Sequence, residues 1–135
     1  MNRGTKQIGM RIFKSKAFAR FARKERISDE KLCEVIKEAN QGNIDADYGG
    51  GVIKQRIARP NQGKSGGYRS IIYYRHEEKA FFVYGWPKSE RANIDDDEEE
   101  AFKKQAKITL ALNDEQISKL IANGTYQEVI CHGKS

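Results

Sequence analysis

The chain has 135 residues, a formal net charge of +6 and a sequence pI of about 9.3. Its length predicts a single domain over residues 1–135 and is short for two domains. No apolar run approaches the ~18 residues of a membrane-spanning helix, and no apolar run of signal-peptide length lies near the first residue. We therefore expect a soluble cytoplasmic protein that has no contact with a membrane.

The positive charge is concentrated in two parts of the chain. Residues 1–27 carry nine lysines and arginines against one glutamate, and residues 48–91 carry nine against three acids. Basic blocks of this kind are typical of proteins that bind phosphate groups, although many small domains are mildly basic for solubility alone. The charge distribution favours a nucleic-acid partner.

The first third of the chain predicts a helical hairpin over residues 14–41, after a short strand at 9–13. Phe18, Phe21 and Ala22 recur at helical spacing and form an apolar stripe on the first helix. Ser28 is a typical N-cap for the second helix. The cations of the first helix are either a solvated face or an electrostatic guide for RNA or the ribosome.

The middle of the chain predicts a sheet over residues 51–87, preceded by a loop at 43–51. Its three strands follow one another with short connections, which favours antiparallel pairing. Alternation places Lys54 and Arg56 on one face of the first strand, about 7 Å apart along it.

The last third predicts C-terminal helices within residues 96–123. Six consecutive acids at 95–100 suit the first turn of a helix, where the helix dipole favours negative charge. Asn113 followed by Gln116 resembles a capping box. The expected fold class is therefore α+β: two N-terminal helices packed on a small, mainly antiparallel twisted sheet, with C-terminal helices.

The two cysteines, Cys33 and Cys131, have no spacing pattern, so the sequence predicts neither a disulfide framework nor a zinc site and fits a reducing compartment. Gly63-Lys64-Ser65 lacks the glycine of a phosphate loop, because Ala58 stands five residues before Gly63. We expect no cofactor and no metal.

The strongest constellation is a group of cations on the predicted strands or at their ends. It contains Lys54, Arg56, Lys64, Arg69, Lys88 and Arg91. Attack of an RNA 2′-hydroxyl on the neighbouring phosphorus needs a base, an acid and cations near the phosphoryl oxygens. Arginine matches phosphate geometry, and lysine crowded by other cations can take part in proton transfer. The group suits RNA cleavage without a metal, or a patch that only binds.

Three runs of the sequence resemble a known family. They are K-Q-R-I-A, G-K-S-G-G-Y-R-S-I-I-Y-Y and A-F-F-V-Y-G-W-P-K-S-E-R, all within residues 51–91. Together with the order of the expected elements, they resemble the RelE/HigB-like toxins of bacterial type II toxin–antitoxin systems, in the RelE/ParE superfamily. The resemblance implies an mRNA endonuclease that cuts translated message in the ribosomal A site. It also implies a cognate antitoxin, usually encoded beside the toxin.

The resemblance also implies roles for individual residues. Arg69 would stabilise the phosphate, while Lys54 or Lys88 would transfer protons, so these three are the expected catalytic residues. The expected RNA-binding residues are Arg56, Arg59, Lys64, Tyr68 and Arg91.

Two positions depart from the best-known members of the family. Ser89 stands where they carry a second arginine, and Asp95 lies where they carry a tyrosine. Tyr68, Tyr84 and Lys64 are the expected stand-ins. Two other functions stay open: a ParE-type toxin, which poisons DNA gyrase without RNA-cleaving residues, and a non-catalytic nucleic-acid-binding module.

Overall fold

The computed structural model describes residues 10–59 and 63–132 and has an α+β fold. In chain order the elements are β1 (Arg11–Ser15), α1 (Lys16–Glu25), α2 (Asp29–Asn40), β2 (Ala46–Gly49), β3 (Val52–Arg59), β4 (Gly63–Arg75), β5 (Lys79–Pro87), α3 (Asp96–Leu110), α4 (Asp114–Ala122) and β6 (Tyr126–Glu128). The expected α+β class is confirmed, but the two N-terminal helices follow a strand that belongs to the sheet.

The sheet has the strand order β2-β3-β4-β5-β1-β6. Strands β2 to β5 form an antiparallel meander, β1 runs parallel to β5, and β6 is antiparallel to β1. The sheet therefore reaches well beyond the expected residues 51–87. Part of the expected loop at 43–51 forms β2, an edge strand that pairs with the first residues of β3.

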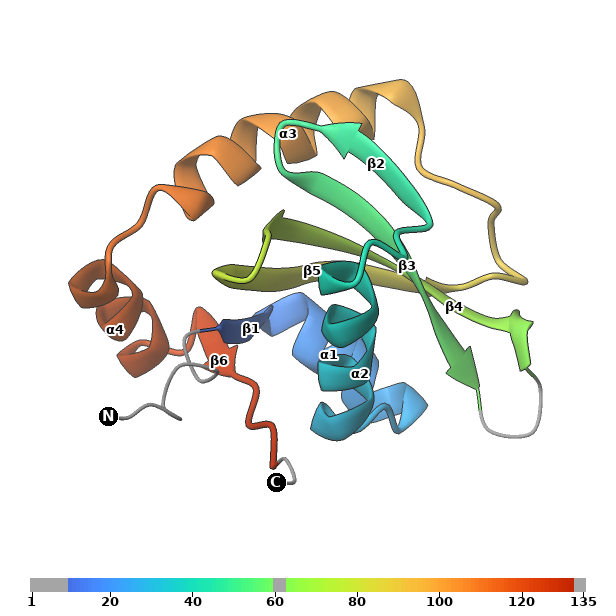
Figure 1. The fold of residues 1–135 in the computed structure, drawn as a ribbon, viewed down its shortest axis with the longest axis horizontal. Coiled ribbons are helices and arrows are strands. Elements are labelled where there is room, and N and C mark those ends of the chain that lie inside the picture. Colours follow the sequence, from blue (N-terminus) through green and yellow to red (C-terminus); the bar gives the residue numbers. More distant parts are fainter. Residues whose placement is uncertain (1–9, 60–62, 133–135) are drawn as a thin grey trace.

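Each face of the sheet is covered by one pair of helices (Figure 1). On the first face, Phe18 of α1 and Leu32 and Ile36 of α2 pack on Ile53 and Ile72 of the sheet. Alternation along β3 and β4 sends neighbouring residues to the opposite face, where a second core lies under α3 and α4. We call these the α1–α2 face and the α3–α4 face.

Each N-terminal helix begins at a serine cap, of which the sequence predicted the one at Ser28. The Ser15 hydroxyl accepts a hydrogen bond from the Phe18 backbone N–H, and the Ser28 hydroxyl accepts one from the Lys31 backbone N–H. Such caps satisfy backbone donors that have no partner inside the helix. The two consecutive helices lie within Lys16–Glu25 and Asp29–Asn40.

The C-terminal helices both begin with a capping box. Asp95 and Glu98 exchange hydrogen bonds at the start of α3, and Asn113 and Gln116 do so at the start of α4. The acidic run at 95–100 is therefore the first turn of a helix, as expected. Both helices pack on the sheet through residues such as Leu110 and Ile117.

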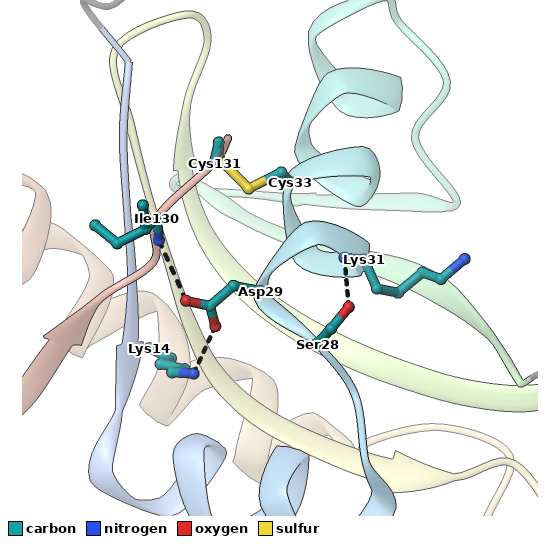
Figure 2. The surroundings of a disulfide bond; sticks show 7 residues. All are labelled: Lys14, Ser28, Asp29, Lys31, Cys33, Ile130 and Cys131. Carbon is teal, nitrogen blue, oxygen red and sulfur yellow. Dashed lines mark hydrogen bonds and ion pairs between the residues drawn. A yellow bond between two sulfur atoms is a disulfide. The ribbon is translucent and has the colours of Figure 1, made fainter. Parts of the chain in front are cut away.

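A disulfide joins Cys33 on α2 to Cys131, which follows β6 (Figure 2). The expectation of no disulfide was wrong, and the reason is topological. Strand β6 pairs with β1, and this carries the chain past α2. The Asp29 carboxylate holds the same crossing, because it accepts hydrogen bonds from the Ile130 N–H and from Lys14 Nζ. The two cysteines lie 98 residues apart in the sequence, so their spacing carried no signal.

Within the described residues, no helix is long and apolar enough to cross a membrane. The same residues contain no group of three or more side chains placed to hold a metal ion.

Candidate nucleic-acid interface

Two cross-strand rows bring the predicted cations together on the α3–α4 face. Arg56 of β3 pairs with Arg69 of β4, which in turn pairs with Trp86 of β5. In the neighbouring row Lys54 pairs with Ile71. Directly paired residues share a face, so Lys54, Arg56 and Arg69 form one cationic group, which we call the basic row.

Arg69 is the most enclosed member of the basic row. Only 5% of the residue is exposed, and Nη1 donates to the Tyr68 carbonyl oxygen at 3.3 Å. Burial lowers the pKa of Arg69, and the nearby positive charge of Arg56 lowers it further. Among the described residues no carboxylate lies within ion-pair distance of Arg69. The Asp45 carboxylate opposes this lowering from a distance. A buried, protonated guanidinium that no carboxylate pairs with directly is suited to attract a phosphate.

A carboxylate, that of Asp45, contacts the basic row. The sequence did not predict this contact. One oxygen accepts from Arg56 Nε at 3.1 Å, and the other lies 3.8 Å from Lys54 Nζ. Asp45 directly precedes β2, and its backbone N–H donates to Gln55 Oε1 at 2.8 Å. Gln55 is 4% exposed and also holds the Asn43 carbonyl oxygen. The loop that carries Asp45 is therefore tied firmly to β3.

Lys88 lies at the end of the same ladder. Its backbone N–H donates to the Gly67 carbonyl oxygen at 3.1 Å, which continues the pairing of β4 with β5 by one residue. Lys88 and Ser89 are both exposed. Strand alternation places Lys88 two residues beyond Trp86, and so about 7 Å further along the strand that borders Arg69.

Arg91 has a structural role. Its guanidinium forms a forked ion pair with Glu98 of α3, donates to the Tyr84 hydroxyl at 3.2 Å and lies over the Trp86 ring. The hydrogen bonds to Glu98 raise the pKa of Arg91. These contacts fasten the start of α3 to β5, so Arg91 is already occupied by protein groups.

Arg59 and Tyr68 belong to the opposite face. Tyr68 is 3% exposed and packs in the core under α1 and α2. Its hydroxyl donates to Glu25 of α1 at 3.0 Å and accepts from Arg59 Nε at 3.0 Å, while the Arg59 guanidinium lies over the Tyr68 ring. This burial leaves no ring surface for a base to stack on Tyr68. The side chain of Lys64 lies outside the described part of the structure.

The structure places both residues that differ from the best-known members of the resembled family, Asp95 and Ser89. Asp95 is the N-cap of α3, so its carboxylate is committed to the helix. Of the expected stand-ins, Tyr84 lies on the α3–α4 face, where its hydroxyl accepts from Arg91. Ser89 follows Lys88 on the exposed surface and has only a short hydroxyl to offer.

Fold and site together define a small α+β protein with a cationic row set across a mainly antiparallel sheet. The family model described as "RelE toxin of RelE / RelB toxin-antitoxin system" matches residues 10–129. The chain belongs to this RelE toxin family, and such toxins are generally ribonucleases that inhibit translation and have a cognate antitoxin. A search of curated proteins found no match.

Proposed function

We propose that the chain is a ribosome-dependent mRNA endonuclease of a type II toxin–antitoxin system, acting in the cytoplasm and inhibited by its antitoxin. The observation that carries the proposal is the basic row, in which Lys54, Arg56 and Arg69 share one face at adjacent positions. Such a cluster can hold a phosphodiester and stabilise the charge that builds up on its oxygens during cleavage.

The reaction that suits this row is an internal transfer. The 2′-hydroxyl oxygen forms a bond to phosphorus while the bond to the 5′-oxygen breaks, which leaves a 2′,3′-cyclic phosphate and a 5′-hydroxyl. Arg69, with Arg56 beside it, would bind the phosphoryl oxygens. Lys54 or the exposed Lys88 would give a proton to the leaving 5′-oxygen, because an ammonium group is a proton donor.

Induced expression in a bacterial host tests this function. We expect the wild type to arrest growth and to produce new mRNA 5′ ends inside translated regions. The double variant Lys54→Ala/Arg69→Ala should do neither at equal expression, and it should still bind the antitoxin. Growth arrest with intact message and damaged gyrase complexes would instead assign the protein to the gyrase-poisoning class. Arrest by the double variant would show that the basic row is not the active site.

A second basic surface supports docking on the ribosome. Five exposed cations lie on or next to α1: Lys16, Arg20, Arg23, Lys24 and Arg26. Within the described residues none of them has a carboxylate at ion-pair distance. Glu25, the acid of α1, contacts Arg59 and Tyr68 instead. Because α1 covers the face opposite the basic row, the protein can hold ribosomal RNA on one side and message on the other.

Charge reversal on α1 should weaken ribosome binding. In Arg20→Glu/Lys24→Glu two cations on neighbouring turns of α1 become acids, so phosphate contacts are lost and repulsion is added. We expect at least a 10-fold weaker affinity in sedimentation with ribosomes, and a slope of log affinity against log salt that is smaller by roughly 1–2. Lys104→Glu/Lys107→Glu on the exposed part of α3 changes the net charge equally. If this control weakens binding as much, only the net charge matters and α1 is not the docking surface.

A further inference from the structure

The proposed cleavage leaves one part unassigned, which is the group that accepts the proton of the 2′-hydroxyl. The cations of the basic row are suited to bind phosphate and to donate protons, and protonated lysine or arginine has no lone pair to accept one. A carboxylate can accept the proton, provided that it lies beside the phosphate-binding cations and that RNA can reach it.

Asp45 meets these geometric conditions. It contacts Arg56 and Lys54 directly, at 3.1 and 3.8 Å, so a phosphate held by these cations lies next to its carboxylate. Its position is fixed by the hydrogen bond from its backbone N–H to the buried Gln55 side chain. Such support from a rigid strand is what a proton acceptor needs, because its reach to the reacting oxygen must be held within a few tenths of an ångström.

An open groove gives access to Asp45. The groove has a volume of about 900 Å³ and lies between α2 and the free part of β3. Asp45 and Arg56 both line it, together with polar side chains such as Asn43 and Gln41. Strand β2 pairs with β3 only as far as Lys54, so the edge of β3 beyond this residue is open to the groove. The nucleoside that carries the 2′-hydroxyl can therefore approach Asp45 from the groove while its phosphate rests on the basic row.

We propose that Asp45 is the proton acceptor of the cleavage reaction, a catalytic residue that takes the 2′-hydroxyl proton while Lys54 or Lys88 supplies a proton to the 5′-oxygen. The proposal rests on the endonuclease function proposed above. As the 2′-oxygen–phosphorus bond forms, the proton passes to an Asp45 carboxylate oxygen, and the bond to the 5′-oxygen breaks. Proton transfer from Asp45 back to the neutral lysine then restores the starting state. Asp45 and Lys54 are already neighbours, at 3.8 Å, so the return to Lys54 requires only a short transfer, whereas a return to Lys88 passes through solvent.

Phosphate binding prepares Asp45 for this role. In the free protein the Asp45 carboxylate is paired with Arg56 and Lys54. The Arg56 side chain is 46% exposed, so it is free to turn toward an arriving phosphate. Once Arg56 and Lys54 bind the phosphate, Asp45 loses part of its pairing, and its carboxylate oxygens are free to accept the proton of the hydroxyl. Charged or titratable groups face Asp45 or line its groove from four elements: Lys54 and Arg56 of β3, Arg69 of β4, Tyr48 of β2, and Lys31, Glu34, Lys37 and Glu38 of α2 across the groove.

The experiment is single-turnover cleavage of message on programmed ribosomes by purified protein, followed across pH. For the wild type we expect the rate to rise with pH and then reach a plateau. Asp45→Asn preserves the size of the side chain but cannot accept the proton. Its rate should fall about 10²–10⁴-fold at pH 7 and should rise in proportion to hydroxide concentration with no plateau. Asp45→Glu should restore the plateau, with a reduced rate because the carboxylate is displaced.

Asp47→Asn is the matched control. Asp47 lies on β2 two residues further along the chain, is exposed, and its carboxylate accepts only from the Gly49 backbone N–H among the described contacts. We expect this variant to keep the wild-type rate and pH profile.

Three results overturn the assignment in distinguishable ways. If Asp45→Asn cleaves within about threefold of the wild-type rate, Asp45 is not catalytic while the endonuclease function stands. If its rate falls but the plateau remains, Asp45 only positions the cations. If the wild type itself cleaves nothing on ribosomes or on free RNA, the proposed function fails and the assignment fails with it. Thermal unfolding of each variant separates loss of folding from loss of chemistry, and the Asp45→Glu profile decides where Asp45→Asn does not fold.

Discussion

Arg69→Met should abolish cleavage while leaving the protein as stable as the wild type or more stable. Arg69 is buried, with 5% of the residue exposed, and its side chain makes one hydrogen bond, to the Tyr68 carbonyl oxygen, among the described contacts. Keeping a guanidinium charged in such a place costs desolvation free energy that no bonded carboxylate offsets. Methionine fills a similar elongated volume without the charge. The free energy of unfolding should therefore stay the same or rise by about 1 kcal/mol.

The loss of activity should be large for the same reason. A buried, preorganised cation stabilises charge on phosphoryl oxygens far better than a hydrated one, and removal of one such group typically costs about 10²–10³-fold in rate. Chemical denaturation and single-turnover cleavage, measured on the same preparation, would show the two opposite effects. Arg75→Met is the matched control, because Arg75 lies on the same strand but contacts Glu78 and the Leu110 carbonyl oxygen. This control should keep its activity.

Either of two results would contradict the role of Arg69. Cleavage by Arg69→Met within about threefold of the wild type would place the phosphate elsewhere. A loss of several kcal/mol in unfolding free energy would mean that the cation is needed for folding.

Reduction of the Cys33–Cys131 disulfide should cost the protein a substantial part of its stability. The bond closes a loop of 98 residues, which comprises most of the described chain. In the chain-entropy account, opening a loop of about 100 residues raises the entropy of the unfolded state by an amount worth about 4–5 kcal/mol, and native disulfides of small domains typically contribute about 2–5 kcal/mol. A melting temperature lower by on the order of 10–20 °C is the expected result.

The measurement compares unfolding with and without a dithiol reductant. Cys131→Ser should show the reduced stability under both conditions, and the wild type should reach the same value only when it is reduced. If the wild type unfolds at the same denaturant concentration in both conditions, the disulfide adds nothing. In that case the Asp29 contacts to Ile130 and Lys14 already hold the C-terminal segment in place.

The local elements of this protein were readable from the sequence because their signals are short-range. The starts of three helices are indicated by capping residues, whose hydrogen bonds reach only two or three residues along the chain. These residues are Ser28, Asn113 and the acids around Asp95. The alternation in β3 likewise places Lys54 and Arg56 on one face, whatever the strand pairs with. Such features need no knowledge of the rest of the chain.

Contacts between distant segments were decided only by the tertiary structure. The parallel pairing of β1 with β5 and the addition of β6 beside β1 carry the segment after β6 to α2, where Cys131 meets Cys33. Strand pairing also separated the predicted RNA-binding residues between the two faces of the sheet. The pairing of Ile57 with Tyr68 sends Tyr68 to the α1–α2 face, away from the basic row.

The role of Asp45 in the site was likewise not predictable from the sequence. In the sequence it is one acid in a stretch with an acidic surplus, nine residues before the cation that it meets at Lys54. Only the return of β2 alongside β3, with the loop before β2 held by Gln55, places its carboxylate beside Lys54 and Arg56. The sequence by itself determined the helix starts and the alternation of residues along each strand, because both depend only on neighbours along the chain. Which charges meet depends on strand register and on which face each residue occupies, and those are properties of the folded sheet.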